Sequence, residues 1–265
     1  MSESRITRRF EELAEEGRSA LIVYVTAGFP EVDTTLPLLE GLADVGADVI
    51  ELGIPFSDPM ADGPTIQASS FRALENGVTV SGVLDMVRAF RERRDTPVVL
   101  FTYLNPVVRY GAERFCAEAR SAGADGVLFT DLPAGADPAL ESAASSAGLD
   151  LIRLLAPTTT PSRVRRVAEG AAGFLYYISR TGVTGARSEL SETLAEEVSR
   201  VRDAVDLPVA VGFGISTADQ ARQVASVAEG VVVGSALVQT LEREGIAGAL
   251  AFVGGLRAGM DEPSG

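Results

Sequence analysis

The 265-residue sequence predicts a single (β/α)₈ barrel with an extra helix before the first strand. Short runs rich in Val, Ile, Leu and Ala recur at spacings of roughly 25–35 residues, as expected for a barrel of about 250 residues. These runs are almost continuously apolar, which indicates parallel strands buried on both faces. Helix-length segments with one apolar stripe separate them. Together these observations favour eight strand and helix units.

The strands can be placed in order along the chain. We expect them at residues 20–26, 47–53, 97–103, 125–130, 149–155, 173–178, 208–212 and 229–233. Apolar residues at i, i+3, i+4 spacing predict helices at 36–46, 80–94 and 192–205, and residues 5–17 predict the extra helix, which would plug the N-terminal face of the barrel. An open doubly wound sheet is the weaker alternative, because no GxGxxG follows the first strand. No stretch has the composition of a linker, so residues 1–265 are expected to form one domain.

Composition narrows the partners and the location. A net charge of -14 and a pI near 4.5 disfavour nucleic acid and anionic membrane surfaces as partners. The longest apolar runs are too short to cross a bilayer, and the N-terminal segment lacks the apolar core of a signal peptide. The cytoplasm is therefore the expected location. Cys116 is the only cysteine, so it cannot form an internal disulfide.

Two residue types are missing from the sequence. It contains no histidine, and all 23 basic residues are arginine. This excludes a Schiff-base lysine, a Ser-His-Asp arrangement and histidine metal sites, so we expect no metal. Carboxylates or tyrosines must carry any protons that move near neutral pH.

Small residues follow the last two predicted strands. Backbone N–H groups of Gly214, Gly234 and Ser235 could approach an anion, and a helix that begins at Ser235 would direct its positive end towards it. The alternative is that the glycines only permit tight turns. The combination of both loops in one barrel favours a phosphate site, over which the glycine-containing loop 180–185 could close.

The second predicted strand ends in ELGIPFSDPMADGPTIQ, which places Glu51 inside an apolar run. Burial raises the pKa of such a carboxyl, which makes it useful as a proton donor and acceptor near pH 7. The alternative is a buried ion pair with an arginine. Asp62 is a second candidate at the same face of the barrel, whereas Asp58 reads as a turn former.

This segment resembles the signature of the tryptophan synthase alpha subunit family, and YVTAGFP, FTYLNPV, YYISRTGVTG, VGFGIS and VVVGSAL extend the resemblance along essentially the whole chain. The resemblance implies a lyase that cleaves indole-3-glycerol phosphate to indole and glyceraldehyde 3-phosphate without a cofactor in this chain. It implies that Glu51 is the general acid and base and that Asp62 binds the indole nitrogen. It also implies that Thr184 hydrogen-bonds that aspartate and that Gly185 contacts phosphate.

The resemblance extends to aromatic residues around the substrate. The positions that match are Tyr24, Tyr103, Tyr176 and Phe213, although ordinary core packing explains each of them equally well. Phe29 stands where the family often has an aspartate and is expected to be peripheral. Phe101 stands where a smaller aliphatic residue is common, so it could narrow the indole pocket.

The family also implies a partner. The resemblance implies that the alpha subunit pairs with a beta subunit that depends on pyridoxal phosphate, as an α₂β₂ assembly, and that the beta subunit holds the cofactor. The lack of lysine in this chain agrees with that division. Asp58 and Pro59 then become candidate interface residues.

Two other functions remain open from the residues alone. The barrel could bind a phosphorylated ligand and regulate a partner without catalysis, which the presence of both acids disfavours. It could also be a different lyase or isomerase of a related sugar phosphate, including an indole-producing enzyme that acts alone.

Overall fold

Eight parallel strands close into a barrel in chain order, with β8 paired to β1. The computed structural model describes residues 4–179, 187–212 and 214–262, with only the backbone for 187–193. The strands are β1 (Ala20–Thr26), β2 (Val49–Gly53), β3 (Val98–Thr102), β4 (Gly126–Phe129), β5 (Asp150–Leu155), β6 (Leu175–Ile178), β7 (Val209–Gly212) and β8 (Gly230–Val233). The predicted barrel is confirmed, and each strand begins and ends within two residues of its expected bounds.

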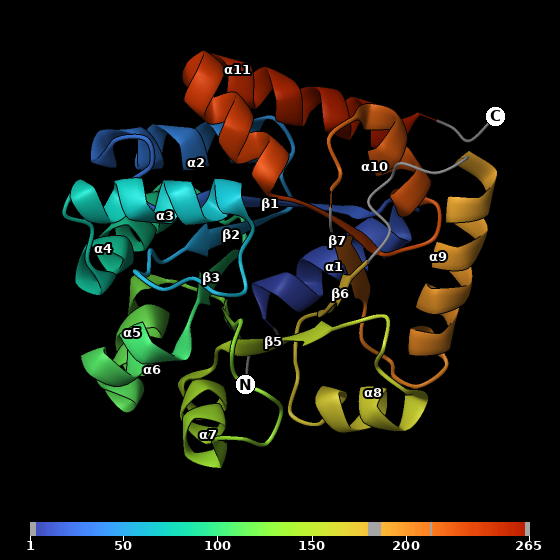
Figure 1. Ribbon diagram of the computed structural model, residues 1–265, viewed down its shortest axis with the longest axis horizontal. Coiled ribbons are helices and arrows are strands. Elements are labelled where there is room, and N and C mark those ends of the chain that lie inside the picture. Colours follow the sequence, from blue (N-terminus) through green and yellow to red (C-terminus); the bar gives the residue numbers. More distant parts are fainter. Residues whose placement is uncertain (1–3, 180–186, 213, 263–265) are drawn as a thin grey trace.

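The chain also forms helices, which, apart from the first, surround the strands on the outside of the barrel, as Figure 1 shows. They are α1 (Arg5–Glu15), the 3₁₀ helix η1 (Val32–Thr34), α2 (Thr35–Asp44), α3 (Pro64–Glu75), α4 (Val80–Arg91), α5 (Leu104–Tyr110), α6 (Ala112–Ala122), α7 (Pro138–Ala147), α8 (Pro161–Ala168), α9 (Arg187–Arg202), α10 (Ala218–Ala225) and α11 (Ser235–Asp261). Gly245 leaves helical geometry inside α11, at φ 68°, and divides it into two helices. Among the described residues, no helix combines the length and apolar character that a bilayer crossing requires.

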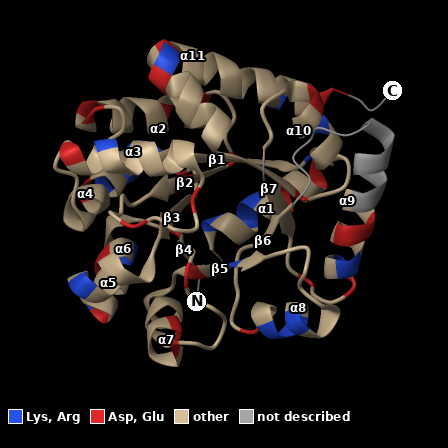
Figure 2. Ribbon diagram, in the orientation of Figure 1, with Lys and Arg blue, Asp and Glu red and all other residues tan. Residues whose placement is uncertain are grey.

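The strand residues alternate between the barrel interior and the helical layer, because successive side chains of a strand point to opposite faces. Val49 belongs to the interior cluster, whereas its neighbour Ile50 packs with the outer core. Glu51, two residues after Val49, therefore faces the interior. Charged residues lie mainly on the outer helices and on α1 (Figure 2).

Helix α1 fills the N-terminal end of the barrel. Its buried residues Ile6, Phe10 and Leu13 belong to the same cluster as the interior residues of the strands. The rings of Phe10 and Phe174 lie 5.6 Å apart, centroid to centroid. The extra N-terminal helix predicted from the sequence is thus confirmed as a plug of the barrel floor.

Buried carboxylates attach this plug to the strands. Asp48 accepts a hydrogen bond from the backbone N–H of Leu21 at 2.7 Å and pairs with Arg9 of α1 at 2.6 Å. In the same way, Asp125 accepts from the N–H of Val98 at 2.9 Å and pairs with Arg5 at 2.9 Å. Because the desolvation of buried charges offsets most of their attraction, these pairs fix the position of α1 more than they stabilise the fold.

The apolar face of α1 should therefore carry its contribution to stability. We predict that Phe10→Ala lowers the free energy of unfolding by about 3–4 kcal/mol, because it removes a ring that is 5% exposed and leaves a cavity in the barrel floor. Urea unfolding followed by circular dichroism measures this difference. A loss below about 1 kcal/mol would show that α1 is not part of the core.

Candidate active site

A cavity of about 490 Å³ opens at the C-terminal end of the barrel, opposite α1. Its walls come from strands β1, β2, β3, β5, β6 and β8, from the loop that leads into α3, and from the first turns of α3 and α11. The described residues that line it are Tyr24, Glu51, Ala61, Asp62, Gly63, Pro64, Ile66, Phe101, Thr130, Leu154, Tyr176, Ile178, Gly214, Ile215, Ser216, Val232, Gly234, Ser235, Ala236 and Gln239. Glu51 and Asp62 are the only ionisable carboxyls among them, and none is arginine.

Glu51 lies at the floor of this cavity and is 1% exposed. Its Oε1 atom is buried without a hydrogen-bond partner among the described groups, and no described arginine pairs with it. The ion-pair alternative considered for Glu51 therefore does not hold for the described residues. Desolvation by burial raises the pKa of Glu51 from 4.5 to about 8, so the carboxyl keeps its proton at neutral pH.

Asp62 lies above Glu51 on the loop between β2 and α3. Tyr103, the first residue after β3, donates a hydrogen bond from its hydroxyl to Asp62 Oδ2 at 3.0 Å and accepts one from the N–H of Ala61 at 3.0 Å. The side-chain amide of Gln67 donates to the backbone carbonyl of Asp62 at 3.0 Å. These contacts hold the loop over the opening of the barrel.

The environment of Asp62 differs from that of Glu51. Desolvation raises its pKa from 3.8 to about 6, and the hydrogen bond from Tyr103 opposes part of that rise by stabilising the ionised form. At neutral pH one cavity therefore contains a protonated carboxyl and an ionised one. This combination suits a reaction that needs a proton donor and a fixed negative charge.

The other end of the cavity is suited to an anion. Helix α11 begins at Ser235, after Gly234, and no side chain caps its first N–H groups. Both residues, with Ala236, line the cavity. Gly214, which follows β7, lines it too and adopts φ 74°, a conformation that favours glycine. The unpaired N–H groups and the positive helix end can bind a phosphate group.

The structure brings most of the predicted site residues together. Glu51, Asp62, Tyr24, Phe101, Tyr176, Gly214, Gly234 and Ser235 line one cavity, and Tyr103 contacts it through Asp62. Thr184, Gly185 and Phe213 lie outside the described residues. Asp58 is exposed, whereas Pro59 is buried within the loop after β2. Phe29 packs in the outer core, away from the cavity.

Several lining residues were missed by the sequence analysis. Leu154 and Val232 face the cavity because each lies at an inward position near the end of its strand. The alternation of side chains along a strand could have predicted both. Gln239 lies one helical turn after Ser235 and donates a hydrogen bond to Thr65 of α3 at 2.8 Å. Thr130 immediately follows β4. Its position after a strand places Thr130 at the functional end of the barrel, but no local sequence pattern distinguishes it from its neighbours as a cavity residue.

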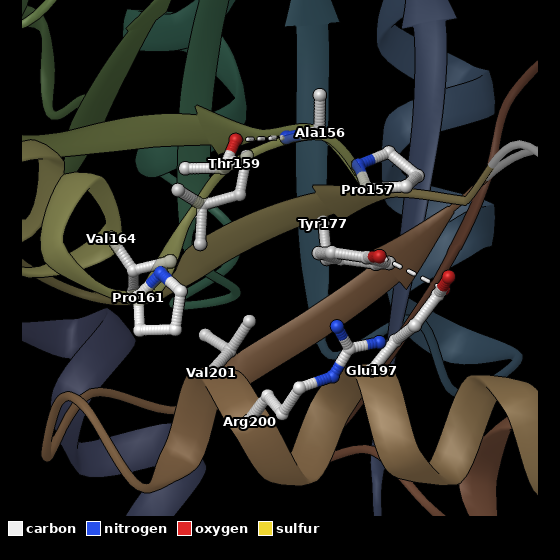
Figure 3. A pocket seen from close by; sticks show the side chains of 10 residues that line it. Ala156, Pro157, Thr159, Pro161, Val164, Tyr177, Glu197, Arg200 and Val201 are labelled. Atoms are coloured by element: carbon white, nitrogen blue, oxygen red, sulfur yellow. Dashed lines mark hydrogen bonds between the residues drawn. The ribbon is translucent and has the colours of Figure 1, made fainter.

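A much smaller cavity of about 20 Å³ lies outside the barrel wall, between α8 and α9. In Figure 3 the hydroxyl of Tyr177 points to Glu197, to which it donates a hydrogen bond at 2.8 Å. Successive side chains of a strand point to opposite faces, so Tyr177 faces the helices whereas its neighbour Tyr176 faces the interior. The space holds about one water molecule, so it is a packing feature rather than a second site.

Comparison with known proteins agrees with this geometry. A family model described as tryptophan synthase alpha chain matches residues 10–251. An alpha chain from Geobacter sulfurreducens is 53% identical over 240 residues, which cover 91% of each chain. One from Geobacter sp. strain M21 is 51% identical over 259 residues, covering 98% of this chain and 97% of that one.

The chain belongs to the tryptophan synthase alpha chain family. Crystal structures agree: the alpha subunit from Legionella pneumophila superposes with a TM-score of 0.91 at 37% identity, covering 98% of this chain and 99% of that one. A tryptophan synthase from Mycobacterium tuberculosis gives a TM-score of 0.90 at 39% identity, covering 99% and 100%. The family resemblance predicted from the motifs is confirmed.

The buried carboxyl should cost stability in a pH-dependent way. The folded chain holds the Glu51 proton up to about pH 8, whereas the unfolded chain releases it near its ordinary pKa of 4.5, so stability is lost as the pH rises through that window. We predict that Glu51→Gln, which cannot ionise, is more stable than the wild type above pH 8 by on the order of 5 kcal/mol, since each pH unit between 4.5 and about 8 costs about 1.4 kcal/mol. Denaturant unfolding between pH 4 and 9 measures the difference, and a difference that does not vary with pH would contradict the assigned burial.

Proposed function

We propose that this chain cleaves indole-3-glycerol phosphate to indole and glyceraldehyde 3-phosphate, with Glu51 as the acid and base and Asp62 as the anion beside the indole nitrogen. This lyase reaction is the activity of its family in tryptophan biosynthesis. The observation that carries the two roles is the pair of carboxyls with separated pKa values, about 8 and about 6, in one cavity. Residues 1–265 act in this proposal as one catalytic domain.

Glu51 moves a proton twice. In its protonated form it donates to C3 of the indole ring, which converts the ring to a cation able to accept electrons. The Glu51 carboxylate then takes the proton of the glycerol hydroxyl next to C3. As that hydroxyl becomes the aldehyde, the C3–carbon bond breaks and its electrons restore the aromatic indole. Glu51 ends the cycle protonated, so protons and electrons balance.

Asp62 keeps its negative charge throughout. An ionised carboxylate that accepts a hydrogen bond from the indole N–H stabilises the positive charge that protonation at C3 creates. Tyr103 supports this role because its hydroxyl binds Asp62 Oδ2 and favours the ionised form. The low polarity of the cavity strengthens this attraction.

The phosphate of the substrate would lie at the far end of the cavity. None of the described lining residues is cationic, so main-chain N–H groups of Gly234, Ser235 and Gly214 carry the binding. The global charge of -14 makes this local arrangement necessary, because an anion gains nothing from the overall field of the protein.

The partner in this proposal is the beta subunit, in an α₂β₂ assembly. Pyridoxal phosphate belongs to the beta subunit, and the absence of lysine from this sequence agrees with that division. Asp58 and Pro59 remain the interface candidates. Met60, next to them, is 80% exposed, which is the kind of apolar side chain that a partner covers. A cytoplasmic location is part of the same proposal.

Activity of the isolated chain tests the catalytic roles. We expect Glu51→Gln to lower indole release by at least about 10³-fold, because the amide can neither give nor take the proton, while substrate affinity changes little. Indole formation and substrate binding by calorimetry measure the two effects. Glu92→Gln, the same change at an exposed position on the outside of the barrel, is the control. Retained turnover in Glu51→Gln would refute the assignment.

The pH profile tests the two protonation states. We expect kcat/KM to fall above about pH 8, where Glu51 loses its proton, and below about pH 6, where Asp62 gains one. Tyr103→Phe removes the hydrogen bond that favours the ionised Asp62, so it should move the acidic limb to higher pH and leave the basic limb unchanged. If the acidic limb stays at the same pH in Tyr103→Phe, protonation of Asp62 is not the cause of that limb.

A further inference from the structure

Two aromatic rings from the strands on either side of β2 meet over Gly53, two residues beyond Glu51. Tyr24 on β1 is in register with Glu51 on β2, and Gly53, two residues further along β2, is in register with Phe101 on β3. Glu51 and Gly53 face the interior together because two residues separate them. Tyr24 and Phe101 line the same cavity from the strands on either side of β2.

Gly53 allows Tyr24 to lie across β2. A Cβ atom at position 53 would come within 2.2 Å of the Tyr24 hydroxyl oxygen and 2.7 Å of Cζ, closer than any side chain tolerates. The tyrosine ring passes over this gap and meets Phe101 edge to face, with centroids 5.1 Å apart and planes at 75°. Glycine at position 53 therefore serves the packing of these rings.

The surroundings of Glu51 contain no described positive charge that would compensate its ionised form. The titratable groups that face it are Tyr24 from β1, Asp62 from the following loop and Tyr176 from β6, while β3 presents only Val99 and Phe101 towards the interior. Each of those three groups is neutral or negative. The protonation of Glu51 thus depends on how well water is excluded, although it borders a cavity large enough to hold several waters.

We propose that Tyr24 and Phe101, seated together by Gly53, form an aromatic wall that keeps water away from the Glu51 carboxyl. Phe101 and Gly53 are then positioning residues for the proton transfer, acting through Glu51 rather than on the substrate. A smaller aliphatic residue at position 101 leaves the Tyr24 ring without its partner and admits water to the carboxyl. This inference rests on the role of Glu51 in the proposed function.

The direct test is a titration of Glu51 in the full chain by carbon-13 NMR of glutamate side-chain carboxyls, with Glu51→Gln to assign the signal. We expect Phe101→Leu and Tyr24→Leu each to lower the pKa of Glu51 by about one pH unit, because water then solvates the carboxylate. Tyr24→Phe, which keeps the ring, should leave it unchanged. Phe129→Leu, the same substitution on the outward side of β4, is the matched control.

The possible results distinguish a failure of the aromatic wall from a failure of the proposed lyase activity. If Phe101→Leu and Tyr24→Leu titrate like the wild type, the wall does not shield Glu51 and the inference is wrong. If Phe129→Leu lowers the pKa as much as Phe101→Leu does, general loosening of the barrel explains the effect and the inference is equally wrong. Since the titration needs no turnover, a lowered pKa supports the wall even in a chain that releases no indole. In an active chain, the basic limb of kcat/KM should move down with the pKa in Phe101→Leu.

Discussion

The burial of one carboxyl, with no cation beside it among the described residues, is the constraint on which the site depends. Glu51 extends an interior face that is otherwise apolar, and the chain accepts the free-energy cost of that burial at the open end of the barrel. An arginine beside it would hold the carboxyl ionised at neutral pH. The burial of this carboxyl without a described cation is therefore what fits Glu51 for its proposed role as a proton donor, at a cost in stability.

The barrel supplies the conditions under which such a group can work. Helix α1 closes the floor with apolar residues and ion pairs, and the cavity in the described residues opens at the end where the loops converge. There the loop after β2 brings an ionised carboxylate, and the start of α11 brings free N–H groups. The protonated carboxyl, the ionised carboxylate and the helix start proposed to bind phosphate thus come from separate elements that meet because the sheet is closed.

Much of this could be predicted from local patterns. The apolar runs located the strands, and the glycines and acids after them located the functional end, because strand direction and side-chain alternation are local properties of the backbone. The hydrogen bond from Tyr103 to Asp62 could not be predicted, since 41 residues separate its partners. The close packing of Tyr24 over Gly53 could not be predicted either, because a glycine near the end of a strand is equally typical of a turn.

The sequence by itself determined the barrel class, the plug helix, the family and the two carboxyls, because each of these rests on periodicity or on contiguous motifs. The tertiary structure alone decided the state of those carboxyls: it buried Glu51 in the interior with no partner for its Oε1 among the described groups, and it gave Asp62 a hydroxyl donor from the residue after β3. The reason is physical. A pKa depends on which groups and how much water lie within a few ångströms, and those neighbours come from distant parts of the chain.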